Sequence, residues 1–423
     1  MDTIIKNAQI QGNKTLLDIG IKDGKIAHIA RNIDDSAGKT IDACGNLVIP
    51  PFVDSHFHLD SVLSLGQPWI NKTGTLLEGI SLWNALKKTP EFTVENLKKR
   101  ALEYCNWAIS QGILSIRSHV DVCDDRLIAV DALLEVQKEV APYLDVQLVA
   151  FPQDGYLRDP NAIVNLERAL DRGVNVVGGI PHAERTMQEG DESIKMLLKV
   201  AEKRGLLVDM HCDESDDPMS RNIETLSCET VRMGMQGRVS GSHLTAMHSY
   251  DNYYFEKLKS LMLDADMHVV SNPLINITLQ GRSDSYPKRR GLTRLPELSG
   301  AGLNVSIAQD CIMDPWYSGG KADMLEAISM GYHTTHMTKH AQIEACFNMA
   351  TINPAKTLKL DGYGLEVGCN ADLVILNANN VVEAVRLKAE RLIVMRLGKI
   401  VAQTTPAITT LNIKNEIIDF KRK

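Results

Sequence analysis

The sequence lacks the marks of a disulfide scaffold and of a membrane protein. None of its eight cysteines forms a CxxC pair, and at 423 residues the chain is far longer than a disulfide-stapled domain. No apolar run approaches the ~20 residues of a membrane helix, and the segment MDTIIKNAQIQGNK has no basic region, apolar core or cleavage site of a signal peptide. We therefore expect reduced thiols in a cytoplasmic protein without a membrane partner.

The sequence also lacks an excess of positive charge. Its formal net charge is −7 at pH 7, whereas proteins that bind polyanions such as DNA present basic faces. We therefore expect no nucleic-acid partner, while a small neutral ligand stays compatible with this charge. The counter-signal is a basic cluster, KRR at 288–290, which is short and which we expect to help close a site or an interface.

What is present is an ordinary globular composition, with 44% hydrophobic and 23% charged residues. A chain of this length favours one large domain and a smaller one. Both ends alternate apolar and polar residues, as in TIIKNAQI, LDIGIKDGKIAHIA, ADLVILNA and RLIVMRLGKIVAQ. We expect residues 1–50 and 366–423 to form a small β-sandwich domain, and residues 51–365 to form the larger domain.

The middle of the chain alternates short apolar runs with segments at helical spacing, such as VENLKKRALEYCNWAISQG and ESIKMLLKVAEKRG. We predict eight strands at LVIPPFVDSH, ILSIRSHV, VQLVAFP, VNVVGGIP, LLVDMHCD, RVSGSHL, MHVVSNP and LNVSIAQD. They are almost continuously apolar, as strands buried on both faces should be. Eight strands alternating with helices predict an α/β fold of the (β/α)8 TIM barrel type.

Polar side chains end most of these runs, where the strands of a barrel converge on the mouth that carries its chemistry. They are His56, His58, His119, Gln153, His211, His243 and Asp310. The spacing of His56 and His58 places both imidazoles on one face of a strand. Glu214, three residues after His211, fits a carboxylate that moves protons beside a metal ligand.

Each of these residues has an ordinary alternative when it is taken singly. The alternatives are a surface pair of histidines, a glutamate that starts a helix, an interior histidine satisfied by its surroundings, and an aspartate that caps a helix. Together, in this order and at these strand ends, the residues predict a metal centre with nitrogen and oxygen ligands.

Over its full length the sequence resembles the amidohydrolase superfamily and, within it, the bacterial cytosine deaminases. The resemblance rests on LVIPPFVDSHFHLD, GTLLEGI, SHVDV, EVAPYLDVQLVAFPQDG, GGIPHAE, HCDESDD, SHLTAMHSY, NPLINITLQGRSDSYPKRRG, DPWY and GLEVGCNADLVIL. It implies a hydrolase that removes ammonia from a free pyrimidine base, acting on the C–N bond of a cyclic amidine in pyrimidine metabolism.

The resemblance implies one divalent ion per subunit, bound by His56, His58, His211 and Asp310. Dinuclear relatives carry a lysine at a strand end, and the third and fourth predicted strands contain none. Nitrogen and oxygen ligands suit Fe(II) or Zn(II), and the resemblance favours iron.

The resemblance also implies the roles of three residues in catalysis. His243 would orient or deprotonate the attacking water, and Glu214 would carry a proton to the ring nitrogen beside C4. Asp310, besides binding the metal, would help to pass a proton to the departing ammonia.

The residues around the base follow from the same resemblance. Gln153 fits an amide that pairs with the O2/N1 edge of the pyrimidine, although an interior glutamine satisfied by backbone is the alternative. Leu76 would touch the base through its backbone. Trp316 and Phe151 would line the pocket, with core packing as the alternative for both. We expect His119 and His182 beside the ligands, and structural or surface roles for His28, His268, His333, His336 and His340.

Cys311 departs from the pattern of the resemblance, because typical cytosine deaminases carry a second aspartate there. A cysteine removes a charge and leaves a small, mildly apolar wall near C5 of the base. Burying a methyl group against such a wall gains ~0.8 kcal/mol, whereas a carboxylate there costs desolvation. We predict that 5-methylcytosine and 5-halocytosines are good substrates; the alternative is a neutral substitution in an ordinary cytosine deaminase.

Other functions remain open at this stage. A relative with the same ligands could act on another heterocycle such as isoguanine or creatinine, and a scaffold without catalysis is a second alternative. A zinc deaminase of polynucleotides would carry an H-x-E…P-C-x-x-C signature, which is absent. The resemblance also leads us to expect a homo-oligomer.

Overall fold

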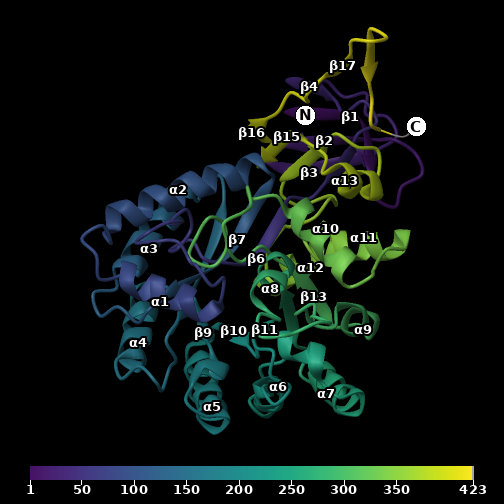
Figure 1. The fold of residues 1–423 in the computed structure, drawn as a ribbon. Helices are drawn as coiled ribbons and strands as arrows, with labels where there is room; N and C mark the ends of the chain where they lie inside the picture. The colour runs from purple at the N-terminus through teal and green to yellow at the C-terminus, as the bar shows by residue number, and fades with distance from the viewer. Residues whose placement is uncertain (422–423) are drawn as a thin grey trace.

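The computed structural model describes residues 1–421 and contains a parallel barrel of eight strands surrounded by helices (Figure 1). In barrel order the strands are β6 (Phe52–Phe57), β7 (Ile113–Asp121), β8 (Asp145–Phe151), β9 (Val176–Gly179), β10 (Leu207–Cys212), β11 (Val239–His243), β12 (His268–Ser271) and β13 (Asn304–Ile307). Each overlaps a run predicted from the sequence and extends beyond it by at most one residue. The predicted TIM-like barrel is confirmed.

The first and last strands close the barrel at its carboxyl end. Phe57 pairs with Asp310 in an isolated parallel bridge. The amide of Asp310 donates to the carbonyl of His56 at 2.9 Å, and the amide of His58 donates to the carbonyl of Asp310 at 3.1 Å. The seam of the barrel therefore runs through three of the expected metal ligands.

Helices cover the outside of the barrel. They are α1 (Leu76–Leu86), α2 (Val94–Ser110), α3 (Ile128–Val140), α4 (Ala162–Arg172), α5 (Met187–Arg204), α6 (Asn222–Arg232), α7 (Asn252–Asp264), α8 (Pro273–Leu279), α9 (Leu295–Gly300), α10 (Met324–Thr334), α11 (His340–Asn348) and α12 (Ile352–Leu358), with short 3-10 turns η1 (Pro181–Ala183) and η2 (Thr245–Ser249). In α2 the Thr93 side chain caps the first turn, and Leu97, Ala101 and Tyr104 form the buried stripe. No helix within residues 1–421 combines the length and apolar character that crossing a membrane requires.

The two ends of the chain meet in a second, mixed sheet (purple and yellow in Figure 1). Its strands are β1 (Thr3–Ile10), β2 (Leu17–Lys22), β3 (Lys25–Ala30), β4 (Lys39–Asp42), β5 (Leu47–Ile49), β14 (Leu373–Leu376), β15 (Arg391–Arg396) and β16 (Lys399–Gln403), with helix α13 (Val381–Leu387) beside them and a separate hairpin β17 (Thr409–Leu411) and β18 (Glu416–Ile418). The ends join where Val48 pairs with Ile375. The expected small β domain from both termini is confirmed as one mixed sheet, while its limits at residues 50 and 366 stay predictions.

Arg391 ties this sheet to the barrel. Its guanidinium donates to Asp323 Oδ1 at 2.5 Å and to the carbonyl of Gln111 at 3.0 Å, and it lies 5.3 Å from the ring centroid of Phe52. Both members of the ion pair are almost completely buried.

The eight cysteines, all within the described chain, are free thiols, as expected.

Candidate active site and metal centre

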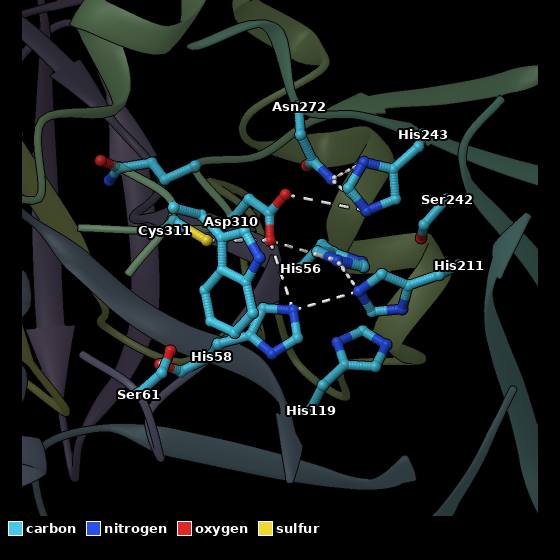
Figure 2. Close-up of polar contacts among 12 residues, drawn as sticks. His56, His58, Ser61, His119, His211, Ser242, His243, Asn272, Asp310 and Cys311 are labelled. Atoms are coloured by element: carbon cyan, nitrogen blue, oxygen red, sulfur yellow. Dashed lines mark hydrogen bonds and ion pairs between the residues drawn. The ribbon is translucent and has the colours of Figure 1, made fainter. Parts of the chain in front are cut away.

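Four side-chain atoms converge at the mouth of the barrel (Figure 2). Nε2 of His211 lies 3.2 Å from Nε2 of His56 and 3.1 Å from Nε2 of His58. Oδ1 of Asp310 lies 3.6 Å and 3.3 Å from the same two atoms. Ligands at about 2.1 Å from one tetrahedral ion stand about 3.4 Å apart, so these atoms have the spacing that one divalent ion needs.

Burial lowers the pKa of the imidazoles at this site. Desolvation lowers the pKa of His56 to about 4, and it lowers the pKa of His58 and of His211 well below the ordinary value. The rings are therefore neutral at physiological pH, which is the form that binds metals. Nδ1 of His56 and of His211 has no hydrogen-bond partner in the described chain. Such a cluster of buried neutral nitrogens fits a metal-binding site.

The backbone at Asp310 is held in an unusual conformation. Asp310 follows the end of β13 by three residues and has a φ of 69°, a left-handed conformation that costs a non-glycine residue roughly 1–3 kcal/mol. The two hydrogen bonds of the barrel seam hold it in place. This backbone conformation directs the carboxylate of Asp310 toward His56 and His58.

His119 lies closer to the ligands than we expected from the sequence. Its ring centroid is 4.1 Å from that of His56 and 4.5 Å from that of His211. Neither of its nitrogens has a hydrogen-bond partner among residues 1–421. Two sets of nearby ligand atoms result, His56, His58, His119, His211 and His56, His211, His243, Asp310. A buried cluster of possible metal ligands is thus shown, while the ligand set stays a proposal.

A buried carboxylate lies beneath this cluster. Asp209 accepts from Arg117 Nη1 at 3.0 Å and from Ser242 Oγ at 2.7 Å, and its Oδ1 lies 3.8 Å from Nδ1 of His56. All of these side chains are inaccessible to solvent. Our sequence reasoning missed Asp209, although it precedes His211 by two residues and so shares its face of β10.

Beside this cluster, Glu214 faces His243. Oε1 of Glu214 lies 3.3 Å from Nδ1 of His243, and Nε2 of His243 lies 3.7 Å from Oδ2 of Asp310. Burial raises the pKa of Glu214 to about 8. Its carboxyl group is therefore protonated at neutral pH and can donate a proton.

Two asparagines that the sequence analysis missed hold His243. Asn276 donates its amide to Nδ1 of His243 at 2.9 Å, and the amide of Asn272 lies 3.3 Å from the same atom. Because Nδ1 accepts, the ring proton lies on Nε2, the nitrogen that faces Asp310. The sequence signal was the pair in NPLIN, four residues apart at the start of α8.

The pocket above the cluster contains most of the predicted substrate-binding residues. It is lined by His58, Leu76, Gln153, Ile180, His211, Glu214, His243, Ile275, Leu279, Asp310, Cys311 and Trp316. Trp316 donates its indole N–H to the carbonyl of Leu76 at 3.3 Å. Phe151, which we expected on the wall, is not among the described residues that line the pocket. It stacks on His211 with ring centroids 4.1 Å apart, so it supports a candidate ligand from behind.

Cys311 forms part of the pocket wall beside Asp310. Its Sγ lies 3.6 Å from Oδ1 of Asp310, and its side chain is almost completely buried. Burial raises the pKa of the thiol well above its ordinary value. The wall at this position is therefore a neutral, polarizable sulfur.

A wider outer cavity gives access to the pocket. The two share Leu76, Gln153, Ile180, Glu214 and Leu279. The outer cavity also includes His182, which therefore lies beside the entrance. None of the five histidines expected to be structural or on the surface, His28, His268, His333, His336 and His340, lines either cavity of the described chain.

Comparison with known proteins agrees with this geometry. The sequence pattern of the Amidohydrolase family matches residues 39–402. The structure of 5-methylcytosine deaminase from Klebsiella pneumoniae liganded with 5-fluorocytosine is 42% identical, with a TM-score of 0.94 over 97% of this chain and 100% of that one. The same enzyme liganded with phosphonocytosine gives 43% identity, a TM-score of 0.93, and coverage of 96% and 100%. N-isopropylammelide isopropyl amidohydrolase from Pseudomonas sp. (strain ADP) is 29% identical over 409 residues, 95% of this chain and 97% of that protein.

Proposed function

This chain belongs to the amidohydrolase family, and from that premise we propose that it deaminates a free pyrimidine base with 5-methylcytosine as preferred substrate. Water and 5-methylcytosine would give thymine and ammonia. Cytosine and 5-halocytosines would also be accepted, the former giving uracil and the latter the corresponding 5-halouracil. The full-length similarity to the Klebsiella pneumoniae 5-methylcytosine deaminase supports this assignment.

The proposed preference for 5-methylcytosine rests on the side chain of Cys311. It presents a neutral thiol to a pocket that is also lined by Ile275 and Leu279. A methyl group on C5 gains about 0.8 kcal/mol from apolar burial, and a thiol wall does not impose the desolvation cost that a carboxylate would. Cytosine lacks the methyl group and would gain nothing from this wall.

The side chains divide the reaction between them. His56, His58, His211 and Asp310 would hold the ion, Fe(II) or Zn(II), which when bound lowers the pKa of a water molecule toward about 7. His243 would orient the attacking water from Nε2, with Asn276 fixing its ring through Nδ1.

Two further side chains would act on the base itself. Glu214, protonated at neutral pH, would donate to the ring nitrogen beside C4 and so make that carbon electrophilic. Gln153 would pair with the O2/N1 edge of the base.

The test is kcat/KM for 5-methylcytosine and cytosine, measured with iron-loaded and zinc-loaded protein. We expect a clear preference for 5-methylcytosine, reversed by Cys311→Asp and retained by the neutral, similarly sized Cys311→Ser. If Cys311→Asp leaves the ratio of kcat/KM for 5-methylcytosine and cytosine unchanged, Cys311 does not determine the substrate preference. Ammonia release from isoguanine, creatinine or N-isopropylated triazines, without release from either cytosine, would assign a different heterocycle to the same centre.

The remaining expectations concern assembly and location. The Klebsiella pneumoniae relative is liganded with cytosine analogues, which fits a small-molecule partner here. Absence of a nucleic-acid partner, a homo-oligomeric state and a cytoplasmic location stay predictions. Sedimentation velocity of the purified chain tests the oligomeric state directly.

A further inference from the structure

The basic cluster at 288–290 lies in the loop between α8 and α9, and its three side chains bind different partners. Lys288 donates to the carbonyls of Gly281 and Asp284, each at 3.0 Å, and so closes its own loop. Arg290 donates to the carbonyl of Thr334 at 3.0 Å, on α10. Arg289 points to the loops that carry the proton-transfer residues.

Arg289 is anchored within its own loop by Asp284. Nε donates to Oδ2 at 2.8 Å and Nη2 donates to Oδ1 at 2.5 Å, while the Arg289 amide donates to Oδ2 at 3.1 Å. The guanidinium lowers the pKa of Asp284 to about 2. A bidentate pair of this kind fixes both the direction and the plane of the guanidinium.

The remaining nitrogen of Arg289 joins two other loops. Nη1 donates to the carbonyl of Asp216, and to Ser249 Oγ at 3.2 Å. Asp216 also accepts from the Gly281 amide at 2.8 Å through its side chain. Three loops, those after β10, β11 and β12, therefore meet at one guanidinium.

Both contacted residues are close to the proton-transfer pair. Asp216 follows Glu214 by two residues, and Ser249 ends the turn η2, which begins two residues after His243. Glu214 and His243 come from these separate loops, yet their side chains face each other at 3.3 Å. Nearer the site the same loops are also joined by Thr245 Oγ1, which lies 3.3 Å and 3.2 Å from the carbonyls of Asp213 and Ser215, and by the Ala246 amide, which donates to the carbonyl of Asp213 at 3.0 Å. Arg289 closes the outer end of the same pair of loops.

We propose that Arg289 is a positioning residue that holds the Glu214 loop and the His243 loop in register. It contacts neither reacting group and acts through the backbone at Asp216 and the hydroxyl at Ser249. The inference rests on the proposed deamination for its kinetic consequence, because the relative position of Glu214 and His243 affects the rate only when both act on one substrate.

Arg289→Lys and Arg290→Lys form a matched pair of variants. Lysine keeps the charge but cannot bridge three loops with one planar group. For Arg289→Lys we expect kcat to fall about tenfold, with KM within about twofold and metal content unchanged. Hydrogen exchange should accelerate in segments 213–220 and 244–250 alone. Arg290→Lys should change none of these quantities, and guanidinium added to Arg289→Ala should restore part of kcat.

Several outcomes overturn the proposal. Equal kcat in the two lysine variants would do so, as would a loss of metal and faster exchange throughout the barrel in Arg289→Lys. Should Arg289→Lys fail to fold, Asp284→Asn removes the anchor and must reproduce the kcat effect. If the wild-type protein deaminates no pyrimidine, the proposed function fails by itself, and the exchange comparison between Arg289→Lys and Arg290→Lys still decides whether the clamp exists.

Discussion

His56, His58 and Asp310, three of the proposed ligands, lie on the seam that closes the barrel and are joined by backbone hydrogen bonds between β6 and the segment after β13. Glu214 and His243 line the same pocket, where Asn272 and Asn276 contact His243 and Arg289 joins the neighbouring loops. We call the first group, together with His211, the ligand half, and the second pair the proton-transfer half. Metal binding should therefore be coupled to the stability of the barrel, and proton transfer to the register of loops.

The largest effect should follow a change in the ligand half. His211→Ala removes a nitrogen that contacts both His56 and His58, so metal and turnover should be lost together. A ligand at 100 to 1,000 times its Kd stabilises the native state by about 3–4 kcal/mol. Removal of the metal with a chelator should therefore lower the free energy of unfolding of the wild-type protein by this amount. A chelator should not change the free energy of unfolding of His211→Ala, and full metal content in this variant would contradict the proposed ligand set.

A change in the proton-transfer half should separate activity from metal binding. Glu214→Gln keeps the size of the side chain but removes its acidic proton, so kcat should fall about 10²–10⁴-fold. Metal content and melting temperature should remain those of the wild type, because Glu214 is outside the ligand half. Glu192→Gln, at an exposed position in α5, is the control. A near-normal kcat/KM in Glu214→Gln would show that Glu214 is not the proton donor.

The same contrast explains what the sequence could and could not predict. The eight strands and the ligand half follow from apolar runs that end in histidine or aspartate, because the fold itself brings strand ends together. Asn276 and Asp209 could not be found this way, since their partners lie in other loops or strands and their residue types are common in turns and on surfaces. The cluster at 288–290 was expected only to help close a site or an interface, because the partners of Arg289 lie in other loops. Phe151 was placed on the wall by the resemblance, yet its ring packs against His211.

A smaller effect should follow loss of the support for His243. Asn276→Ala removes the 2.9 Å hydrogen bond to Nδ1 and leaves the buried imidazole without its fixed tautomer. A lost hydrogen bond of this kind costs about 1–1.5 kcal/mol, which corresponds to roughly tenfold in kcat. Asn272→Ala, whose contact is 3.3 Å long, should cost less. Single-turnover rates at constant metal loading measure both, and an effect on KM alone in Asn276→Ala would place this residue in substrate binding.

The smallest effect should come from the pocket wall that belongs to neither half. A Cβ added at Gly79 would lie 2.3 Å from Cδ1 of Trp316, so Gly79→Ala must displace the indole that donates to the carbonyl of Leu76. Overpacking costs about 1–3 kcal/mol of folding stability, but its effect on catalysis should be small. Trp316 would contact the base without moving protons, so its displacement should raise KM more than it lowers kcat. Gly300→Ala, where an added Cβ meets nothing within 4 Å, should leave both constants unchanged. Steady-state kinetics with 5-methylcytosine distinguishes the two cases, and a fall in kcat at constant KM for Gly79→Ala would mean that the wall also sets the register of the proton-transfer half.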